Sequence, residues 1–356
     1  MTKKSVAIIF GGKSVEHQIS INSARNIFEY IDKSKFEPIP IGISQQGDWF
    51  LKSSIDNNFG SQPPLALELS TSKKGFKNLS DGSIISPDVI FPVLHGTDGE
   101  DGSIQGLLES FEFPYVGTGV LGSALSMSKL YSKRLLEAAK IPVSAYSTYD
   151  FAQKEAIKFD QIESKLGLPF MAKAANLGSS VGVVKVKSAA DFEAAVDEVF
   201  KFDKTIIFEE YVDGRELECS VMGNSKPVAS MPAEIVVSKN YEFYTYEAKY
   251  LDPNAVELHV PAKVDKVVAD KIREMSVKAY KALNCEDFAR VDLFLKGNGD
   301  ILINEINTIP GFTNSSMFPM MWKERGISFT DLITQLIGMA FERQKNNQRI
   351  TNQYKP

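Results

Sequence analysis

The sequence predicts an α/β protein of two or three domains, with a parallel sheet in its N-terminal part. Residues 1–121 alternate short apolar runs with helical patterns, and this alternation is typical of parallel strands connected by helices. The length of 356 residues also exceeds that of a usual single domain. Changes in pattern near residues 121 and 212 divide the chain into segments 1–121, 122–212 and 213–356.

The first segment contains three expected strands and two expected helices. The strands are the apolar runs SVAIIF (5–10), FEPIPIGI (36–43) and DVIFPVL (88–94). The helices cover residues 17–31 and 103–111. Between them lies a polar excursion over residues 53–83, which we interpret as a surface insertion.

The second segment mixes helices and strands around a glycine-flanked loop. Its expected elements are, in order, a helix over 128–140, a helix from about Asp150, two strands around the loop NLGSSVG (176–182), a helix over 188–200 and a strand over 205–212. The first helix ends before Pro142, because the residue before a proline disfavours the α conformation. Ser188 and Asp191 have the spacing of a capping box.

The third segment is richer in strands. The expected strands cover 216–223, 227–237, 288–295 and 301–307, and the expected helices cover about 264–283 and a C-terminal stretch from Ser328. Asp331 follows Ser328 with capping-box spacing. The longest irregular stretch, about 238–261, is aromatic and charged, and a loop of that length indicates a lid.

Composition and charge exclude several classes of protein. A net charge of −5 argues against nucleic acid as the main partner. Cys219 and Cys285 are too few for a disulfide framework and have no metal-ligand spacing. The N-terminal apolar run is too short for a signal peptide, and no run approaches the length of a membrane span. We therefore expect a reduced, cytoplasmic protein that binds no membrane.

Two apparent nucleotide motifs fail on inspection. GGKS at 11–14 looks like the end of a P-loop, but Ala7 stands where that motif needs its first glycine. GTGVLG at 117–122 fits the dinucleotide fingerprint, yet Glu137, which has the spacing of the ribose acid, falls inside a helical pattern. We interpret 117–122 as a glycine hinge between domains, and a dehydrogenase is a weaker alternative.

The stretch RVDLFLKGNGDILINEIN (290–307) reads as a β-hairpin with polar residues on one face. A four-residue turn would pair Lys296 with Ile301, Asp292 with Glu305, and Arg290 with Asn307. A turn of odd length would instead place Asp292 opposite Asn304. Two facing carboxylates repel each other unless a cation lies between them, and such oxygen ligands suit Mg²⁺ with substrate phosphates. The alternative is a solvated hairpin face with one Arg–Asp pair.

Lysines and a glycine loop elsewhere in the chain could bind those phosphates. Lys173 lies at the end of an expected strand, directly before the glycine loop, whose backbone N–H groups could surround a phosphate chain. Lys129 begins a helix and is a second candidate. The strand IIFEEYV (206–212) could pair with an adenine edge, and Glu216 is suited to a ribose diol.

Taken together, these motifs resemble a known enzyme superfamily. Lys129, Lys173 with GSSVG, EEYVDGRE, RVD and NEINTIPG, in this order, resemble the ATP-grasp carboxylate–amine ligases. FGGKSVEHQIS (10–20), HGTDGEDG (95–102), YEAKY (246–250) and EINTIPGFTNSSM (305–317) are similar to the D-alanine–D-alanine ligase family within it. The likeness spans residues 6 to about 340.

The resemblance implies a fold, a reaction and ligands. The fold would be a three-domain ATP-grasp architecture with an N-terminal Rossmann-like α/β domain. The reaction would join two D-alanines for peptidoglycan synthesis through an acyl phosphate, with ATP and two Mg²⁺ ions, for which Mn²⁺ can substitute. The protein would be a homodimer. Acyl phosphates hydrolyse, so a lid that excludes water fits this chemistry.

The resemblance also implies the roles of individual residues. For the first D-alanine these are Glu16 and His95, and for the carboxylate of the second they are Ser316 and Met317. For ATP they are Lys129, Lys173, Ser179, Ser180, Glu209, Glu210, Tyr211, Val212, Glu216 and Lys249. The metal ligands are Asp292, Glu305 and Asn307, and the oxyanion donors are Arg290 and the backbone N–H of Gly311. Ser179 and Tyr250 would link the glycine loop and the lid to Glu16.

Two alternatives share the nucleotide site. One is an ATP-grasp ligase with a different acceptor, such as D-lactate or another amino acid. Tyr250, which lies in the EAKY pattern of the lid, favours the amine acceptor D-alanine. The other is a nucleotide-binding regulator without turnover. Retention of the metal ligands, Arg290 and both lysines argues against it.

Overall fold

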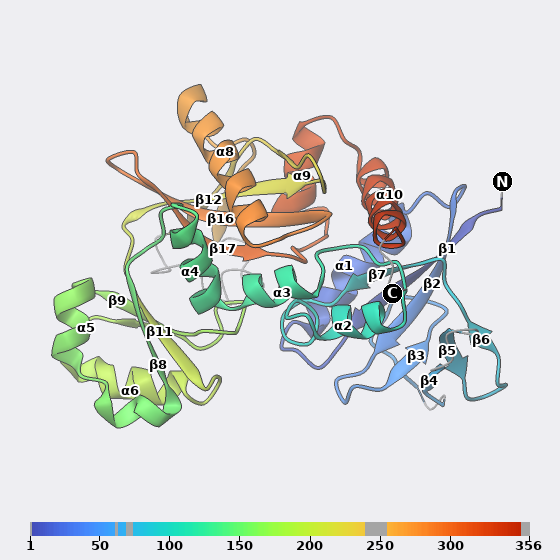
Figure 1. The fold of residues 1–356 in the computed structure, drawn as a ribbon, viewed down its shortest axis with the longest axis horizontal. Coiled ribbons are helices and arrows are strands. Elements are labelled where there is room, and N and C mark those ends of the chain that lie inside the picture. Colours follow the sequence, from blue (N-terminus) through green and yellow to red (C-terminus); the bar gives the residue numbers. More distant parts are fainter. Residues whose placement is uncertain (1, 61–62, 69–73, 239–254, 350–356) are drawn as a thin grey trace, which may run out of the picture.

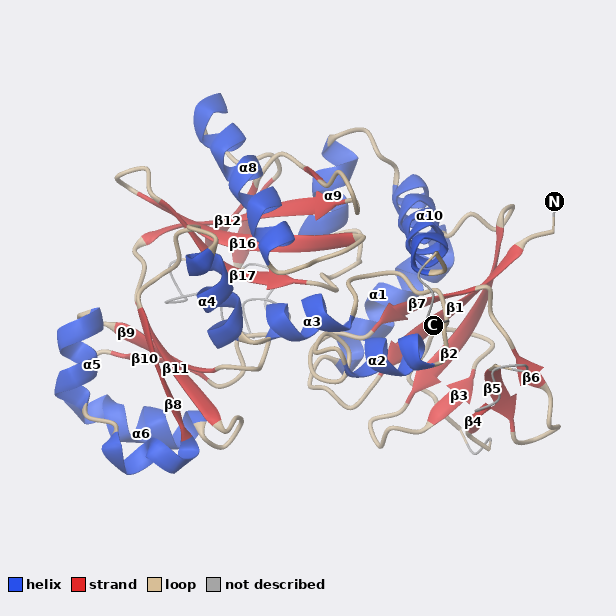
Figure 2. Ribbon diagram, in the orientation of Figure 1, coloured by secondary structure: helices blue, strands red, loops and turns tan. Residues whose placement is uncertain are grey.

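The computed structural model describes residues 2–60, 63–68, 74–238 and 255–349. Its long axis runs from an N-terminal sheet to a central sheet, and a third sheet lies between and above them (Figure 1). Helices cover the faces of these sheets (Figure 2). Within the described ranges, no helix combines the length and the apolar character needed to cross a bilayer.

The N-terminal sheet is mostly parallel, as predicted. Its strands are arranged in the order β3-β2-β1-β7, with bounds Trp49–Leu51, Phe36–Ile43, Lys4–Gly11 and Val89–Val93. β1 pairs in parallel with β2 and β7, and only the edge strand β3 is antiparallel. The two expected helices are α1 (His17–Tyr30) and α2 (Ser103–Ser110).

The excursion over 53–83 is more structured than a simple surface insertion. It contributes to a small antiparallel sheet of β4 (Leu65–Glu68), β5 (Gly75–Asn78) and β6 (Ile84–Ile85). Phe76 in β5 is buried and stacks with Trp49 and Phe113. The excursion therefore buries apolar surface of the N-terminal domain.

The central sheet is entirely antiparallel. Its order is β10-β9-β11-β8, with bounds Val183–Val186, Phe170–Ala174, Thr205–Glu210 and Tyr146–Asp150. The helices of this part are α3 (Val120–Met127), α4 (Lys129–Ala138), α5 (Phe159–Leu166) and α6 (Ala189–Val199). The helix expected from Asp150 is instead a 3₁₀ turn, Phe151–Ala156, and α5 follows as a separate helix.

The C-terminal sheet is also antiparallel, and six of its strands lie in the described part of the chain. Its main path is β15-β14-β12-β16-β17, and β13 pairs with β12. The strand bounds are Val256–His259, Ala233–Val237, Gly214–Met222, Phe288–Lys296 and Ile301–Asn307, with β13 at Val228–Ala229. The helices are α8 (Lys266–Ala282), α9 (Met317–Glu324) and α10 (Phe329–Asn347).

The predicted lid is only partly described. Residues 239–254, with Lys249 and Tyr250, lie outside the described residues. The expectation of an irregular stretch is wrong for residues 256–259, because these form β15 and pair with β14. Ser238 donates its N–H to the carbonyl of Ala255 at 2.7 Å, so these two described residues lie side by side at this sheet edge.

The two expected capping boxes differ in outcome. Ser328 accepts the N–H of Asp331 at 3.1 Å and donates to its carboxylate at 2.6 Å, which confirms the start of α10. At α6, Ser188 donates to the Asp191 carboxylate at 2.9 Å, but its hydroxyl accepts no capping backbone N–H. The Asp191 carboxylate reaches the N–H of Lys187 instead, at 3.2 Å.

The last helix packs against the first domain. Residues of α10 share one buried cluster with residues of β1, β7 and α1; they are Leu332, Ile333, Leu336, Ile337 and Ala340. The chain therefore returns to its N-terminal sheet, which the division at 212/213 did not anticipate. The domain boundaries themselves stay predictions.

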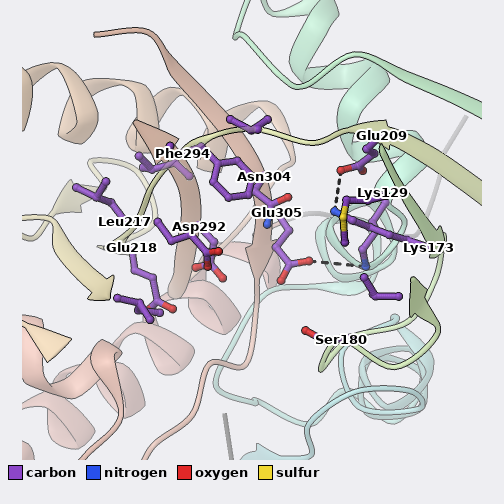
Figure 3. A pocket seen from close by; sticks show the side chains of 18 of the residues that line it. Lys129, Lys173, Ser180, Glu209, Leu217, Glu218, Asp292, Phe294, Asn304 and Glu305 are labelled. Atoms are coloured by element: carbon purple, nitrogen blue, oxygen red, sulfur yellow. Dashed lines mark hydrogen bonds and ion pairs between the residues drawn. The ribbon is translucent and has the colours of Figure 1, made fainter. Parts of the chain in front are cut away.

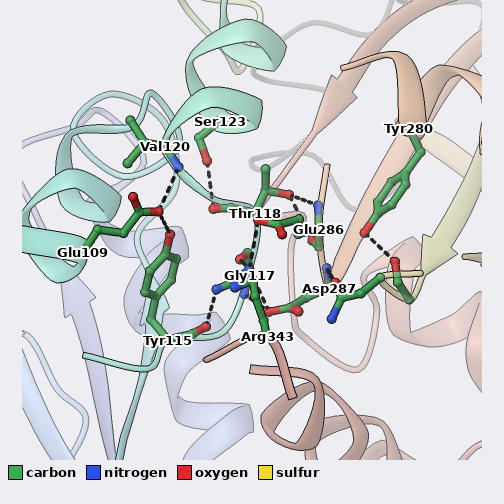
Figure 4. Close-up of polar contacts among 12 residues, drawn as sticks. Glu109, Tyr115, Gly117, Thr118, Val120, Ser123, Tyr280, Glu286, Asp287 and Arg343 are labelled. Carbon is green, nitrogen blue, oxygen red and sulfur yellow. Dashed lines mark hydrogen bonds and ion pairs between the residues drawn. The ribbon is translucent and has the colours of Figure 1, made fainter. Parts of the chain in front are cut away.

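A buried ionic junction holds α10 against the end of the N-terminal domain (Figure 4). Arg343 of α10 donates to the carbonyls of Tyr115 and Gly117, the first at 2.6 Å, and lies 3.3 Å from Asp287. Asp287 in turn accepts the N–H of Gly117 at 2.9 Å. The exit from the N-terminal domain, the start of β16 and α10 are thus held at one point, close to the predicted glycine hinge.

Candidate active site

One pocket lies between the central and C-terminal sheets (Figure 3). Its lining includes most of the residues predicted for ATP and metal. They are Lys129, Lys173, Ser179, Ser180, Glu209, Glu210, Tyr211, Val212, Glu216, Arg290, Asp292 and Glu305. Residues far apart in the sequence therefore meet in one place, because two separate sheets form the walls of the pocket.

The hairpin of β16 and β17 has the predicted pairing at the end that lies away from its turn. Asp292 lies opposite Glu305, and Arg290 lies opposite Asn307. The route to this pairing differs from the prediction, since the turn is closed by Lys296 and Asp300 and Ile301 pairs with Leu295 rather than with Lys296.

A β-bulge reconciles the short turn with this pairing. The register shifts by one residue between Asp292 and Leu293, and Asn304 is the extra residue on β17. Without that shift the odd-length turn would place Asp292 opposite Asn304. The expected pair of Lys296 with Ile301 is wrong because the turn is one residue shorter than assumed.

The charges on the hairpin face are balanced by cations. Arg290 contacts both carboxylate oxygens of Asp292, Nε–Oδ1 and Nη2–Oδ2, at 2.7 Å each. Asn307 donates its side-chain amide to Asp292 at 2.9 Å. Lys129 Nζ lies 3.7 Å from Glu305 Oε2. The facing carboxylates thus accept cationic partners from two directions.

The oxygen atoms on the hairpin face are suitable ligands for a divalent cation that also binds phosphate. In the described ranges, no group of three or more His, Cys, Asp or Glu side chains could hold a metal. The predicted set supplies two carboxylates and one carboxamide, Asp292, Glu305 and Asn307. Such a set suits Mg²⁺, which commonly takes one or two carboxylates and completes its shell with water and phosphate oxygens.

Two lysines project into the pocket from the central part of the chain. Lys129 begins α4 and donates its ammonium to the carbonyl of Leu177 at the glycine loop. Lys173 lies in β9 and donates to Glu209 Oε2 at 2.8 Å. Glu209 was predicted to lie in the strand that pairs with adenine, and its carboxylate accepts a hydrogen bond from a lysine.

Sequence reasoning missed a third lysine beside this pair. Lys133 is fully buried, and its Nζ lies 3.4 Å from Glu209 Oε1. The signal was available, because Lys133 follows Lys129 by one helical turn and shares the buried face of α4 with Ser132 and Leu136.

The glycine loop reaches the N-terminal domain. Ser179 and Ser180 have φ values of 53° and 58°, a left-handed conformation that turns the loop back on itself. The Ser179 hydroxyl donates to the carboxylate of Glu16. The predicted link between Ser179 and Glu16 is therefore present, while that with Tyr250 lies outside the described residues.

His95 connects the N-terminal domain to the segment that follows β17. Its Nδ1 donates to the carbonyl of Ile309 at 2.8 Å, and Nε2 lies 2.9 Å from the Ser23 hydroxyl. Ser23 also accepts the N–H of Phe312 at 3.1 Å. Burial lowers the pKa of the His95 imidazole, which favours a neutral ring with Nε2 as the acceptor from Ser23.

A second missed residue, Glu100, lies in the same corner. It accepts the N–H of Gly96 and the N–H of Ile309, each at 2.8 Å. Burial, reinforced by the nearby Glu16 carboxylate, raises the pKa of Glu100 to about 8. Its place in the HGTDGEDG stretch was the sequence signal that could have identified it.

The segment after β17 is shaped around Gly311. A side chain there would place its Cβ 2.9 Å from the Ser316 hydroxyl, so only glycine fits without a shift. Ser316 accepts the N–H of Thr313 at 3.0 Å and precedes α9. Met317 is buried against Ala233 and its neighbours, which leaves its backbone N–H, in the first turn of α9, as the group suited to a carboxylate.

Comparison with known proteins identifies the family. The family model described as "D-ala D-ala ligase N-terminus" matches residues 5–118, and the model described as "D-ala D-ala ligase C-terminus" matches residues 135–338. D-alanine--D-alanine ligase of Oceanobacillus iheyensis is 45% identical over 98% of each chain. D-alanine--D-alanine ligase A of Escherichia coli K12 is 44% identical over 96% of this chain and 97% of its own.

Solved structures agree with this assignment. The VanG D-Ala:D-Ser ligase from Enterococcus faecalis matches with a TM-score of 0.86 and 37% identity, over 95% of this chain and 100% of its own. The D-alanine-D-alanine ligase from Coxiella burnetii matches with a TM-score of 0.86 and 35% identity, over 98% and 97%. The chain belongs to the D-alanine–D-alanine ligase family and has its multidomain ATP-grasp fold.

Proposed function

We propose that this chain joins two D-alanines into D-alanyl-D-alanine for peptidoglycan synthesis, using ATP and an acyl-phosphate intermediate. The main support for this proposal is a single pocket lined by Lys129, Arg290, Asp292 and Glu305. In it, the Lys129 ammonium lies 3.7 Å from Glu305. Phosphoryl transfer to a carboxylate needs charge neutralisation and positioning rather than a covalent protein group. This choice is supported by relatives named D-alanine--D-alanine ligase, which match this chain over nearly their whole length.

ATP would occupy the pocket between the two sheets. Lys129 and Lys173 would neutralise its phosphates, and the backbone of the loop with Ser179 and Ser180 would cover them. The stretch Glu209–Val212 would pair with the adenine edge, and Glu216 would accept from the ribose hydroxyls. Lys249 would add a cation from the lid.

Asp292, Glu305 and Asn307 would hold two Mg²⁺ ions, for which Mn²⁺ can substitute. These ions would neutralise charge on the phosphates when bound. Arg290 would stabilise the oxyanion that develops when the second amine attacks, together with the N–H of Gly311. Arg290 is held against Asp292, so its guanidinium is directed at the pocket.

The two D-alanines would bind towards the N-terminal domain. Glu16 would hold the ammonium of the first one, and His95 would lie near its carboxylate. Both side chains are buried, which limits the access of water to the acyl phosphate. Ser316 and the N–H of Met317 would bind the carboxylate of the second D-alanine, and Tyr250 would complete the link to Glu16 from the lid. The protein would act as a cytoplasmic homodimer.

A second candidate function differs only in the acceptor. A D-Ala:D-Ser ligase superposes on this chain with a TM-score of 0.86, so the fold accommodates another acceptor. The retained Tyr250 favours D-alanine.

Product analysis separates these candidates. Purified protein is incubated with Mg²⁺-ATP, with D-alanine alone or with added D-serine or D-lactate, and ADP and product masses are measured. Release of ADP that depends on D-alanine, with a D-alanyl-D-alanine mass, is expected. Release only with a second acceptor would replace the substrate assignment. No release with any acceptor, despite ATP binding, would favour a regulator.

A further inference from the structure

Lys133 is a lysine with no exposed side-chain surface, yet it lies beside a ligand pocket. Lysines are almost never fully buried unless they are paired. Lys133 Nζ donates to the Ser144 hydroxyl at 2.8 Å and lies 3.4 Å from Glu209 Oε1. Lys129, one turn earlier on α4, lines the pocket, whereas Lys133 does not. Lys133 therefore lies behind the pocket wall and can act on a ligand only through a neighbour.

Glu209 is that neighbour, and two lysines share its carboxylate. Oε2 accepts from Lys173 at 2.8 Å, on the pocket side, and Oε1 faces Lys133, on the buried side. The Glu209 side chain is only 3% exposed, so solvent contributes little to its orientation. The carboxylate is held at both oxygens, and through it the position of the Lys173 ammonium is fixed as well.

We propose that Lys133 is a positioning residue for the nucleotide site, which holds Glu209 and, through it, Lys173 in the orientation that receives the nucleotide. The inference rests on the proposed function only in placing the nucleotide in this pocket. Lys133 itself does not line the pocket.

The electrostatics of the cluster support this role. Burial alone would raise the pKa of the Glu209 carboxyl, but Lys133 and Lys173 together outweigh burial and lower the pKa to about 2. Burial also lowers the pKa of Lys133, and Glu209 opposes that effect. Removing Lys133 would leave a buried carboxylate with one cation, free to turn towards Lys173 and to withdraw its ammonium from the phosphates.

The test measures the dissociation constant of ADP by calorimetry for the whole protein. Lys133→Met keeps most of the side-chain volume and removes the charge, and we expect ADP to bind at least about tenfold more weakly. Lys154→Met is the matched control, because it removes a lysine whose ion pair with Asp197 lies on the surface of the same part of the chain. ADP affinity of that control should stay unchanged.

A double-mutant cycle separates positioning from a merely structural role. If Lys133 acts through Glu209, Lys133→Met should change ADP affinity little in a Glu209→Gln background. A lower melting temperature of Lys133→Met with unchanged ADP affinity would overturn the inference. Equal losses of affinity in both backgrounds would also overturn it, since Lys133 would then act independently of Glu209.

Two further variants keep the outcomes distinct. Lys173→Met should weaken ADP binding strongly; if it does not, the nucleotide lies elsewhere and the proposed site fails, whatever Lys133 does. Should Lys133→Met not fold, Lys133→Gln is compared instead, because it removes the charge that faces Glu209 and keeps a donor for the Ser144 hydroxyl. Weaker ADP binding by that variant supports the inference, and unchanged binding contradicts it.

Discussion

Lys129 places its ammonium nitrogen 3.7 Å from Glu305 Oε2, across the pocket between two separate sheets (Figure 3). The start of α4 and the second strand of the hairpin are thereby linked by an electrostatic contact. A phosphate chain between them would meet a lysine on one wall and carboxylate-bound metal on the other.

Replacing Glu305 with glutamine should therefore abolish most turnover without unfolding the protein. The variant keeps the side-chain shape but replaces the negatively charged carboxylate, which would bind the metal, with a neutral carboxamide. We therefore expect kcat to fall at least about a hundredfold. The free energy of unfolding should change by less than about 1 kcal/mol, because the side chain is partly exposed. Glu274→Gln, on the surface of α8, serves as the control. Near-normal turnover of Glu305→Gln would remove Glu305 from the metal site.

Glu100 should make stability depend on pH in a defined direction. Its pKa is about 8 in the folded protein and 4.5 in its reference state, so the folded state retains a proton that the unfolded state has lost between those values. The contribution of Glu100 to stability is present below about pH 4.5 and is lost as the pH rises through 8.

Urea unfolding of the wild type and of Glu100→Gln at several pH values measures this effect. Glutamine cannot ionise, and its loss of one acceptor for the N–H groups of Gly96 and Ile309 is the same at every pH. The variant should therefore gain stability relative to the wild type as the pH rises from 4.5 to 8. A difference that stays constant over this range would show that Glu100 has no raised pKa.

The ionic junction of Arg343 should matter for stability. Arg343→Met leaves the buried Asp287 without its guanidinium partner, and we expect a loss of about 3 kcal/mol in the free energy of unfolding. Lys345→Met, two residues further along α10 and exposed, is the control. Denaturation curves of both variants decide the matter. Equal stability of the two would mean that the junction does not hold α10 against the N-terminal domain.

Tyr250 should influence the acceptor rather than the nucleotide. Tyr250→Phe removes the hydroxyl that would connect the lid to Glu16, and we expect a lower rate with D-alanine while ADP affinity changes less than about twofold. Competition between D-alanine and D-lactate, with dipeptide and ester separated by mass, measures the preference. An unchanged D-alanine profile would contradict the role assigned to Tyr250.

The strands that carry the site could be predicted from the sequence, but the details of their register and of the packing around them could not. Asp292 and Glu305 face each other as expected, yet only because the bulge at Asn304 compensates for a shorter turn. Alternation of side chains along a strand does not reveal such a bulge. The packing of α10 on the first domain was equally hidden, since an apolar helix face does not indicate which sheet will cover it.

Within the site, residues with recognisable motifs were predicted and buried partners were not. Lys133 resembles any helical lysine until Glu209 and Ser144 are placed beside it in space. Glu100 is one of three acidic residues in its loop, and the sequence does not show that it accepts the N–H groups of Gly96 and Ile309. Long-range contacts of this kind depend on the tertiary fold, which periodicity and spacing do not encode.

The acyl-phosphate mechanism is tested most directly by following a carboxylate oxygen of D-alanine into the phosphate product. D-alanine labelled with ¹⁸O in its carboxylate is incubated with the protein and Mg²⁺-ATP, and the masses of dipeptide and inorganic phosphate are measured. A carboxylate oxygen that attacks the γ-phosphorus leaves with that phosphate when the second amine attacks the carbonyl carbon. We expect one ¹⁸O in each phosphate released per D-alanyl-D-alanine formed. Dipeptide accompanied by unlabelled phosphate would exclude the acyl-phosphate mechanism.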